Sequence, residues 1–568
     1  MTRKLFVISL ACIFAIIQVR ASVFNKPNSD GVTIYYETIT GSDKKVMVRN
    51  GPDLYRGVVN IPDSVTFEGV TYSVEAIKSY AFAYNVALKK VSLGSNITAI
   101  MEYAFYECSA LDSIFLGNKI KTIENWAFTL CSSLKSINLS EGLTEIGDYV
   151  FGDCISLSDI SIPNSVTKIG NLSFAGCKSL TSFTVPNGVI SINDNAFESC
   201  VNLAQITMGD NLASLGENVF FRCLKLKEFV VSENNKNYST IEGVLVDKGK
   251  TELILFPNAK SSKYSIPSSI KVIGKKAFSL CPNIAEISVP NRLTAIASKA
   301  FFECSNLTMI TFGSSVDSIS PGAFSYCYNL KSIALPTSLK HIADSVFLHS
   351  GLESITMPDG ILTIGKRAFA HSGITNLTIG ENITTIGESA FYECLGLTKI
   401  LIPDNVISIG EGAFYECRNV TELTIGKNVT KIENFAFYPM TNLKVVNNRN
   451  PIPQKVENIF QSVWTSLPTL FVPVGSGTAY KSANVWKNFI VEEKIDVANE
   501  AINKKRILIT NIIGGITISC DEPVQTSIYS ISGQMVSQKL LNDRHELFLP
   551  RGFYIVKAGH LTQKVFVE

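Results

Sequence analysis

The segment Cys131–Phe151, CSSLKSINLSEGLTEIGDYVF, decides the fold, because variants of it recur along most of the chain. Its last phenylalanine returns every 22 or 23 residues from Phe82 to Phe437, with one interruption, and gives fifteen copies. A unit of this length is too short to bury a core alone, so neighbouring units must stack as the coils of a solenoid.

The apolar positions of the unit indicate how each coil packs. Leu134, Ile137 and Leu139 point into the stack, while Ile146 and Phe151 close its other side. Ser, Thr, Gly, Asn and Pro fill the turns, as turn geometry requires. Strands of successive coils then pair at the usual spacing of about 4.7–4.9 Å. The sequence therefore predicts a mainly β, leucine-rich-repeat solenoid of about fifteen 22–23-residue coils over residues 75–447.

The repeat also carries a family resemblance. The pattern Leu-x-x-Ile-x-Ile-Pro, then Val-Thr-x-Ile-Gly-x-x-Ala-Phe-x-x-Cys, is nearly complete in Leu157–Cys177, where Ser173 replaces the alanine. It resembles the BspA-like leucine-rich repeats of bacterial surface proteins. The resemblance covers roughly residues 75–447, and residues 451–487 resemble the segment that closes such arrays. It implies adhesion, with host extracellular-matrix or plasma proteins, glycans or other cells as partners.

Both flanks of the array differ from the repeat. Arg3 and Lys4 precede an apolar run and a small-residue cleavage site, so residues 1–21 are interpreted as a signal peptide of an exported protein. The run is shorter than the roughly 20 apolar residues of a membrane-spanning helix, and no transmembrane segment is expected in the mature chain. Residues 22–74 and 448–497 are expected to form an N-terminal β cap and a C-terminal cap, because terminal coils must cover an exposed apolar end.

One interruption separates Phe220 from Phe278. Within it, residues 244–246 and 253–256 flank a polar turn, which predicts a β-hairpin in an insertion at about 232–265. The insertion is either a projecting binding element or a longer variant of the coil, and the longer coil is the favoured interpretation.

Residues 498–568 lack the repeat and contain short alternating strands, which predict a small β-sandwich. The runs Ile528–Gln534 and Leu549–Val556 resemble the C-terminal sorting domain of the type IX secretion route. This resemblance implies a domain for outer-membrane passage and surface attachment, joined to the array by a polar linker near residues 496–506.

Eleven of the thirteen cysteines follow the repeated phenylalanine by three residues. They share one position and face the same way in adjacent coils, and Asn85, Ser350, Ser372 and Met440 replace them in the other copies. A position open to Ser and Asn suits a small side chain that bonds to local backbone at a turn. We therefore expect free, buried thiols, with disulfides between coils as the alternative. A linear ladder does not supply the converging ligands of a zinc site.

His349 and His371 occupy the same position in consecutive coils, so we expect them to stand side by side. Two ligands without an obvious third make a poor metal site, and chance use of a solvated turn is the favoured explanation. The sequence predicts no cofactor and no metal.

The outward position of the repeated strand is polar in most coils and defines a candidate binding surface. Phe115 and Leu401 interrupt it as apolar residues that can anchor a partner. The alternative is strand propensity with water outside. The candidate residues are Phe115, Asn138, Ser161, Thr184, Thr207, Thr311, Thr356, Thr378, Leu401 and Thr424.

The chain has 51 Lys and Arg against 49 Asp and Glu, and this near-balance argues against a nucleic-acid partner. No nucleophile elbow, phosphate loop, zinc-protease motif or dinucleotide fingerprint stands in a fitting context, so no enzyme is predicted. The sequence favours an exported, surface-associated protein that binds protein or glycan partners. The alternatives are a structural scaffold of the cell envelope and an accessory to glycan processing.

Overall fold

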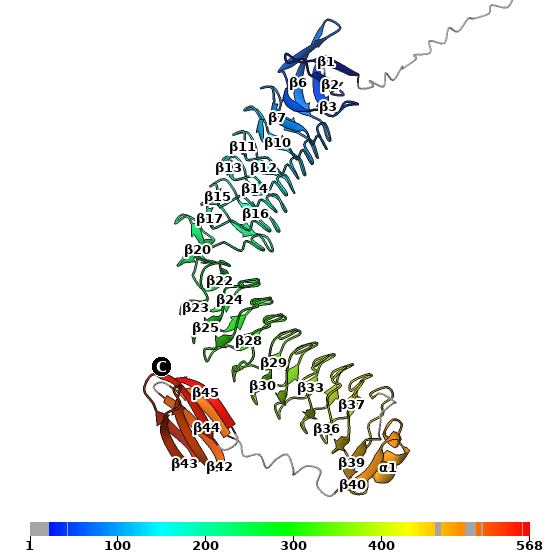
Figure 1. Cartoon of the computed structure of the whole chain (residues 1–568), viewed down its shortest axis with the longest axis vertical. Coiled ribbons are helices and arrows are strands. Elements are labelled where there is room, and N and C mark those ends of the chain that lie inside the picture. The colour runs from blue at the N-terminus through cyan, green and yellow to red at the C-terminus, as the bar shows by residue number, and fades with distance from the viewer. Residues whose placement is uncertain are drawn as a thin grey trace, which may run out of the picture. The chain divides into compact units, whose positions relative to one another are not determined.

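The computed structural model describes residues 22–42, 44–460, 467–494, 507–512, 515–558 and 561–567. The expected signal peptide and the expected linker near residues 496–506 lie outside the described residues. The predicted mainly β solenoid is confirmed. Its coils follow one another from the blue to the yellow part of the chain in Figure 1, and a small antiparallel β region follows them in sequence.

Most regular coils carry two strands, and these pair in parallel with the corresponding strands of neighbouring coils. In the coil quoted above these are β11 (Ser136–Asn138) and β12 (Glu145–Ile146). Parallel pairing sets Ile137 beside Ile114 of the preceding coil and Ile160 of the following one. Because side chains alternate between the two faces of a strand, this register repeats the same inward and outward positions in every coil.

The strands of the array fall into these two sets. The first strands of the coils are β7 (Leu88–Ser92), β9 (Ser113–Phe115), β11, β13 (Asp159–Ser161), β15 (Ser182–Val185), β17 (Gln205–Met208), β19 (Glu228–Val231), β23 (Lys263–Ser265), β25 (Glu286–Ser288), β27 (Met309–Thr311), β30 (Ser354–Thr356), β32 (Asn376–Thr378), β34 (Lys399–Leu401) and β36 (Glu422–Ile425). The second strands are β8 (Ala99–Ile100), β10 (Thr122–Ile123), β12, β14 (Lys168–Ile169), β16 (Ser191–Ile192), β18 (Ser214–Leu215), β24 (Val272–Ile273), β26 (Ala295–Ile296), β28 (Ser318–Ile319), β29 (His341–Ile342), β31 (Thr363–Ile364), β33 (Thr385–Ile386), β35 (Ser408–Ile409) and β37 (Lys431–Ile432).

The repeated phenylalanines stack ring on ring through the core. Phe174 is fully buried, and its ring centroid lies 5.4 Å from that of Phe151 and 5.3 Å from that of Phe197. The stack is longer than the sequence analysis predicted, because Phe256 stacks on Phe278 at 4.7 Å and Phe460 on Phe437 at 5.5 Å. Both were missed because the segments around them lack the rest of the repeat pattern.

Backbone hydrogen bonds also join the turns of successive coils. The N–H of Phe105 donates to the carbonyl oxygen of Ala127 at 2.8 Å, and equivalent bonds recur along the array. In the same turn, Trp126 and Leu130 both have a φ of 63°, a left-handed conformation that is uncommon outside glycine. The bonds between coils hold the turn in this conformation, and its side chains point outward from two fixed positions.

The interruption is built into the sheet. β20 (Tyr238–Ile241), β21 (Val244–Asp247) and β22 (Glu252–Leu255) form an antiparallel meander. β22 pairs in parallel with β24, the second strand of the next coil. Leu245 is fully buried. These strands are therefore part of the sheet and not a projection from it.

The N-terminal strands lead into the array. They are β1 (Val23–Pro27), β2 (Thr33–Thr38), β3 (Lys45–Arg49), β4 (Gly57–Asn60), β5 (Ser64–Phe67) and β6 (Val70–Ile77). β1, β2 and β3 pair antiparallel, while β6 pairs in parallel with both β3 and β8. The first sheet thus passes from an antiparallel edge to the parallel strands of the coils, and Ile34 and Tyr36 are buried beneath it.

The segment after the last regular coil has a core of its own. It contains β38 (Val445–Asn448), β39 (Thr469–Pro473), the helix α1 (Gly477–Ser482), the 3-10 turn η1 (Trp486–Asn488) and β40 (Ile490–Lys494). Tyr480 and Trp486 are fully buried. The Tyr480 hydroxyl donates to the Asn450 carbonyl oxygen at 2.8 Å, and Trp486 Nε1 donates to that of Gln454 at 3.1 Å.

The last part of the chain forms one antiparallel sheet of five strands: β41 (Ile507–Ile512), β42 (Gly515–Ser530), β43 (Met535–Phe548), β44 (Gly552–Ala558) and β45 (Leu561–Val567). β42 is one long strand where short strands were expected, and it pairs with β41 through its first half and with β44 through its second. Ile516 and Ile528 belong to the buried core of this sheet.

Candidate functional site

One sheet face brings candidate residues from neighbouring strands into a single surface. β4, β7, β9, β11 and β13 lie side by side in that order. The register sets Asn60 beside Ser92, and Ser92 beside Phe115. Asn138 and Ser161 are direct partners on the next two strands, so they continue the same row. The row therefore offers hydroxyl and amide groups on either side of one aromatic ring.

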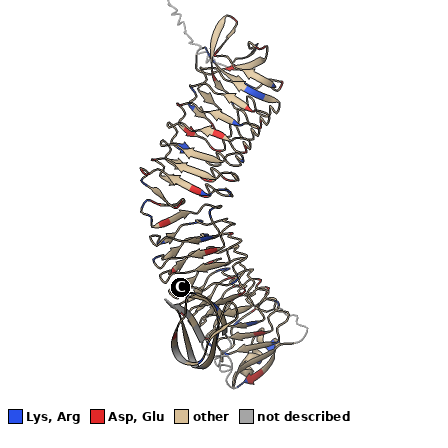
Figure 2. Ribbon diagram, turned by 60° about the vertical axis from the view of Figure 1, so that its left-hand side comes forward, with Lys and Arg blue, Asp and Glu red and all other residues tan. Residues whose placement is uncertain are grey.

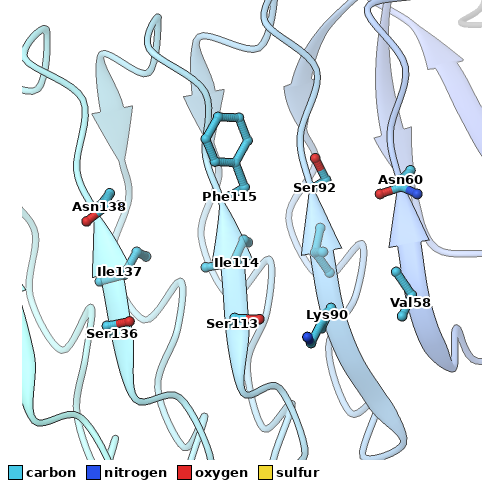
Figure 3. Close-up of a pocket in the computed structure, with 11 residues that line it drawn as sticks. Val58, Asn60, Lys90, Ser92, Ser113, Ile114, Phe115, Ser136, Ile137 and Asn138 are labelled. Carbon is cyan, nitrogen blue, oxygen red and sulfur yellow. The ribbon is translucent and has the colours of Figure 1, made fainter.

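Phe115 is the largest apolar side chain of this face. It is 63% exposed, and Figure 3 shows its ring standing over the strands between Ser92 and Asn138. Val58 is 53% exposed and pairs in register with Lys90, which adds an apolar contact and a positive charge at one end. An open groove runs across β4, β7, β9 and β11 and is lined by these side chains.

The backbone below the groove is held firmly. Ile114 and Ile137, the neighbours of the outward residues along β9 and β11, are 7% and 2% exposed and anchor those strands in the core. The outward side chains therefore stand on a preformed surface. Hydroxyl, amide, ammonium and hydrocarbon groups line the groove, and they support reversible apolar and hydrogen-bonded contacts with a partner.

The remaining predicted surface residues are distributed over other sheets. Thr184 pairs directly with Thr207 on β15 and β17, and Thr356 pairs with Thr378 on β30 and β32. Thr311 lies on β27, and Leu401, 40% exposed, lies on β34. Of the predicted residues, Phe115 and Asn138 line the groove, and Ser161 lies beside Asn138 on the next strand of the same sheet.

Two of the predicted surface residues are less accessible than expected. Thr207 is partly buried, and Thr424 is only 8% exposed. The side-chain amide of Asn447, on the neighbouring strand β38, donates to Thr424 Oγ1 at 3.4 Å. The prediction that Thr424 lies on the exposed surface is therefore wrong, because the strand that follows the regular coils carries a longer side chain beside it.

The eleven ladder cysteines are free and buried, as predicted. Their hydrogen-bond partner differs from the expected local carbonyl. The thiol of Cys154 donates to the carbonyl oxygen of Phe128, one coil earlier, at 3.1 Å. Asn85, at the start of the ladder, bonds within its own turn, to the Phe82 carbonyl oxygen at 2.6 Å. Burial raises the pKa of Cys200 to about 12, which favours the protonated donor form.

His349 and His371 stand side by side, as predicted. Their ring centroids are 4.2 Å apart and their planes differ by 2°, and Tyr326 stacks on His349 at 4.9 Å. Nδ1 of His371 lies 3.2 Å from a carboxylate oxygen of Glu393. Partial burial and the neighbouring His371 lower the pKa of His349. Among the described residues, no group of three or more His, Cys, Asp or Glu side chains could hold a metal ion.

A column of aromatic rings on the turns of the first four coils was not predicted from the sequence. Tyr80, Tyr103, Trp126 and Tyr149 each stand two residues before a core phenylalanine, and their rings stack one on the next. The signal was present in the sequence as a second 23-residue spacing. It was hidden because the position is not aromatic in most later coils.

Charged residues are interspersed along the coils. Figure 2 shows both charge signs scattered along the ribbon, and some of these residues pair between neighbouring coils, as Lys331 and Glu353 do at 3.0 Å. Exposed pairs of this kind contribute at most about 1 kcal/mol each. Within the described ranges, no helix has the length and apolar character needed to cross a membrane.

Comparisons with known proteins agree on the repeat. The family model described as "BspA type Leucine rich repeat region (6 copies)" matches residues 63–178, 144–242, 252–375 and 362–483. No curated protein gives a significant match.

Several solved structures resemble the chain. A leucine rich cell surface protein from Faecalibacterium prausnitzii A2-165 is 24% identical with a TM-score of 0.48, over 70% of this chain and 94% of that protein. The pneumococcal vaccine antigen PcpA is 19% identical with a TM-score of 0.38, over 84% of this chain and 98% of that one. A leucine rich repeat protein of T. pallidum is 31% identical with a TM-score of 0.30, over 34% of this chain and 86% of that one.

Proposed function

The chain belongs to the family built on the BspA type leucine-rich repeat region, and on that premise we propose that it is a non-enzymatic binding protein of the bacterial cell surface. Its partners are host extracellular-matrix or plasma proteins, or glycans, and its role is adhesion. The observation that carries the proposal is the exposed ring of Phe115 on the groove of β4, β7, β9 and β11.

The physical argument concerns what an exposed ring on a rigid face can do. Covering a phenylalanine side chain contributes about 1.5–3 kcal/mol, because apolar surface leaves water. Little of this free energy is lost to ordering the backbone on binding, because the strands under Phe115 are already fixed by buried Ile114 and Ile137. Asn60, Ser92 and Asn138 can add hydrogen bonds around the ring. A solenoid extends such a surface over several coils, so modest contacts add up.

The test measures binding of the full mature chain to immobilised matrix proteins, plasma proteins and a glycan array. We expect binding to at least one of them, and we expect Phe115→Ala to weaken it about tenfold, the loss typical of an interface anchor. Leu224→Ala is the matched control, because Leu224 is also exposed, at 44%, but lies on a turn away from this face. The control should bind as the unchanged protein does.

Two results would contradict the proposal. Equal binding by Phe115→Ala and the unchanged protein would remove the groove as the contact surface. Absence of binding to every matrix protein, plasma protein and glycan would instead favour the alternative role as an envelope scaffold.

Surface location is part of the proposal and rests on the two chain ends. We infer a signal peptide at residues 1–21 and a type IX sorting role for residues 498–568. The antiparallel sheet of β41–β45 has its own buried core, which supports an independent unit. Deletion after Val497 should leave the melting of the repeat region nearly unchanged and reduce the amount of protein on the cell surface. Unchanged display would exclude the sorting role, and unfolding of the coils would make this region a structural cap.

A further inference from the structure

The outward turns of the first coils carry an unusual density of aromatic side chains. The ring centroids of Tyr80 and Tyr103 are 4.9 Å apart, those of Tyr103 and Trp126 are 5.7 Å apart, and those of Trp126 and Tyr149 are 3.8 Å apart. All three pairs are within 16° of parallel. Tyr106 contacts Tyr103 edge-on at 5.5 Å and widens the column to a band. We call Tyr80, Tyr84, Tyr103, Tyr106, Trp126 and Tyr149 the aromatic band.

The fold does not require aromatic residues at these positions. In the next three coils the position of Tyr80 is taken by Leu172, Asn195 and Asn218, on the same left-handed backbone. The core phenylalanine stack continues unbroken beneath both sets of coils, from Phe82 to Phe220. The band lies outside that core, and Tyr80 and Tyr84 are 47% and 52% exposed. A partner is therefore a better explanation for the rings than the stability of the coils.

The same turns are acidic. They carry five carboxylates next to the rings: Glu102, Glu107, Glu124, Asp148 and Asp153. Their one cation is Lys78, which is already bound to Glu37 at 2.6 Å. Within the part of the chain that the structure describes, none of the five carboxylates forms an ion pair.

The negative field reaches the phenol groups. Partial burial raises the pKa of Tyr103, and the negative charge of Glu102 raises it further. Partial burial and the neighbouring Tyr84 raise the pKa of Tyr106, and Glu107 adds to the effect. Anionic and aromatic groups are thus combined within one small surface.

The later coils show the contrast. At the position of Tyr80, three of them present Lys276, Lys299 and Arg367, and the last presents Phe435. Lys276 is engaged with Glu217 at 3.1 Å. Among the described coils, a stacked column at this position is therefore a feature of the first coils. Rings stack again in the last coils, where the centroids of Tyr392 and Tyr415 are 5.3 Å apart, but there they stand one residue after the core phenylalanine.

We propose that the aromatic band is a docking surface for an extended, arginine- or lysine-rich segment of a partner protein. The inference rests on the proposed binding function and names a second surface, distinct from the groove at Phe115. The long aliphatic stems of arginine and lysine pack along the ring edges while their charged heads reach Glu102, Glu107 and Glu124. Four coils at about 4.8 Å spacing span roughly 14 Å between Tyr80 and Tyr149, which matches about five residues of extended peptide.

The ring geometry favours a peptide over a sugar. A sugar packs its apolar side against the open face of an aromatic ring. Both faces of Tyr103 are already covered, by Tyr80 on one side and Trp126 on the other. What the column offers to solvent is a strip of ring edges flanked by carboxylates, and charge complementarity selects a cationic partner.

The experiment uses the full mature chain and a fluorescent synthetic peptide of about seven alternating arginine and serine residues, long enough to span the band. Its comparison peptide replaces each arginine by citrulline, which keeps the shape and removes the charge. Fluorescence anisotropy at physiological ionic strength measures both affinities. We expect the arginine peptide to bind and the citrulline peptide to bind at least about tenfold more weakly, because exposed charges remain effective at contact distance at this ionic strength.

Two double variants test the surface itself. The first, Tyr103→Asn with Trp126→Asn, introduces the residue that Asn195 and Asn218 already place at that position. The second, Glu102→Gln with Glu107→Gln, removes two charges. Each should weaken arginine-peptide binding about tenfold, as loss of interface anchors does. The matched control is Glu303→Gln with Glu411→Gln, which removes two exposed charges from the corresponding turn positions of later coils and should leave the affinity unchanged. Thermal melts confirm that all variants remain folded.

The outcomes separate this inference from the proposed function. Equal weakening by the control pair would mean general charge attraction and would overturn the inference. Loss of glycan binding, without loss of peptide binding, in the Tyr103→Asn, Trp126→Asn variant would show that the occupant is a sugar and would also overturn it. If Phe115→Ala fails to affect matrix or glycan binding while the band variants lose peptide binding, the proposed groove is wrong and the docking surface stands.

Discussion

The thiol of Cys131 donates a hydrogen bond to the carbonyl oxygen of Phe105, 3.1 Å away and one coil earlier. The same bond recurs from Cys108 to Phe82 and from Cys417 to Phe391, near the two ends of the ladder. Each thiol is therefore directed toward a backbone oxygen and serves as a link between coils. The regular row of cysteines has, in this geometry, a role that needs the reduced form.

We expect the ladder thiols to be unreactive in the folded protein. Burial raises the pKa of Cys304 and Cys394 to about 12, so the reactive thiolate is scarce near neutral pH. Titration with a thiol reagent, on protein purified without reductant, should label few ladder cysteines before unfolding and nearly all of them in denaturant. Stoichiometric linkage of Cys108 to Cys131 in mass spectrometry would contradict this expectation.

The ring stack should dominate the stability of a coil. Phe174 is fully buried between Phe151 and Phe197, so Phe174→Ala removes its contacts on both sides and should cost about 3–5 kcal/mol. Thr184→Ala, on the exposed side of a nearby strand, should stay within about 0.5 kcal/mol. Denaturant unfolding of both variants measures the difference, and equal losses would show that the assigned facing is wrong.

A glycine pair at one coil position tests how closely the turns approach each other. A Cβ atom added at Gly188 would lie 1.8 Å from the carbonyl oxygen of Asn164, in the preceding coil. At the equivalent Gly142, the nearest atom would be the Ile120 carbonyl oxygen at 3.4 Å. Gly188→Ala should therefore destabilise by about 1–3 kcal/mol through backbone displacement, as overpacking does.

Gly142→Ala is the matched control for this substitution and should be nearly neutral in the same unfolding experiment. If both variants melt like the unchanged protein, the two coils do not approach each other as closely as described.

His349 should resist protonation. Partial burial and the adjacent His371 lower the pKa of His349, while the more distant Glu393 opposes the shift. A folded state with a lowered histidine pKa binds fewer protons than the unfolded chain below about pH 6.5. The contribution to stability is therefore present above that pH and is lost as the pH falls through it.

Imidazole titration by NMR measures this effect directly. The midpoint of His349 should lie below about 6.5 and should rise in His371→Gln, which removes the neighbouring charge. His341→Gln is the control, because His341 lies on β29 and bonds to Thr363. An unchanged midpoint in His371→Gln would show that the two rings do not interact.

Much of the fold follows from one period in the sequence. The inward placement of Leu134, Ile137 and Phe151 was predictable because every coil must bury the same positions to stack. The place of Phe256 in the ring stack and the hydrogen-bond partner of the thiols were not predictable from this period. Phe256 joins the stack from an irregular segment, and the bond from Cys131 reaches 26 residues back, a distance set by how coils superpose and not by local turn chemistry.

The candidate sites divide in the same way. Phe115 was found because a large apolar residue interrupts a polar row, whereas Val58 and Lys90 lie on or beside the irregular first strands and carry no periodic signal. Thr424 was misplaced because its exposure depends on the side chain of Asn447 in the next strand, whose amide bonds to it. The aromatic band has its own 23-residue spacing, but only four coils carry it, whereas fifteen carry the core phenylalanine.

The bonds that hold a coil in place have a consequence for how such a gene can change. The backbone bond from Phe105 to Ala127 and the thiol bond from Cys131 to Phe105 both reach only the adjacent coil. Duplication or loss of one 23-codon unit therefore recreates the same contacts at the new junction and leaves all others untouched. The number of coils can therefore change by recombination. The strands at the two ends of the array differ from the repeat and occur once each.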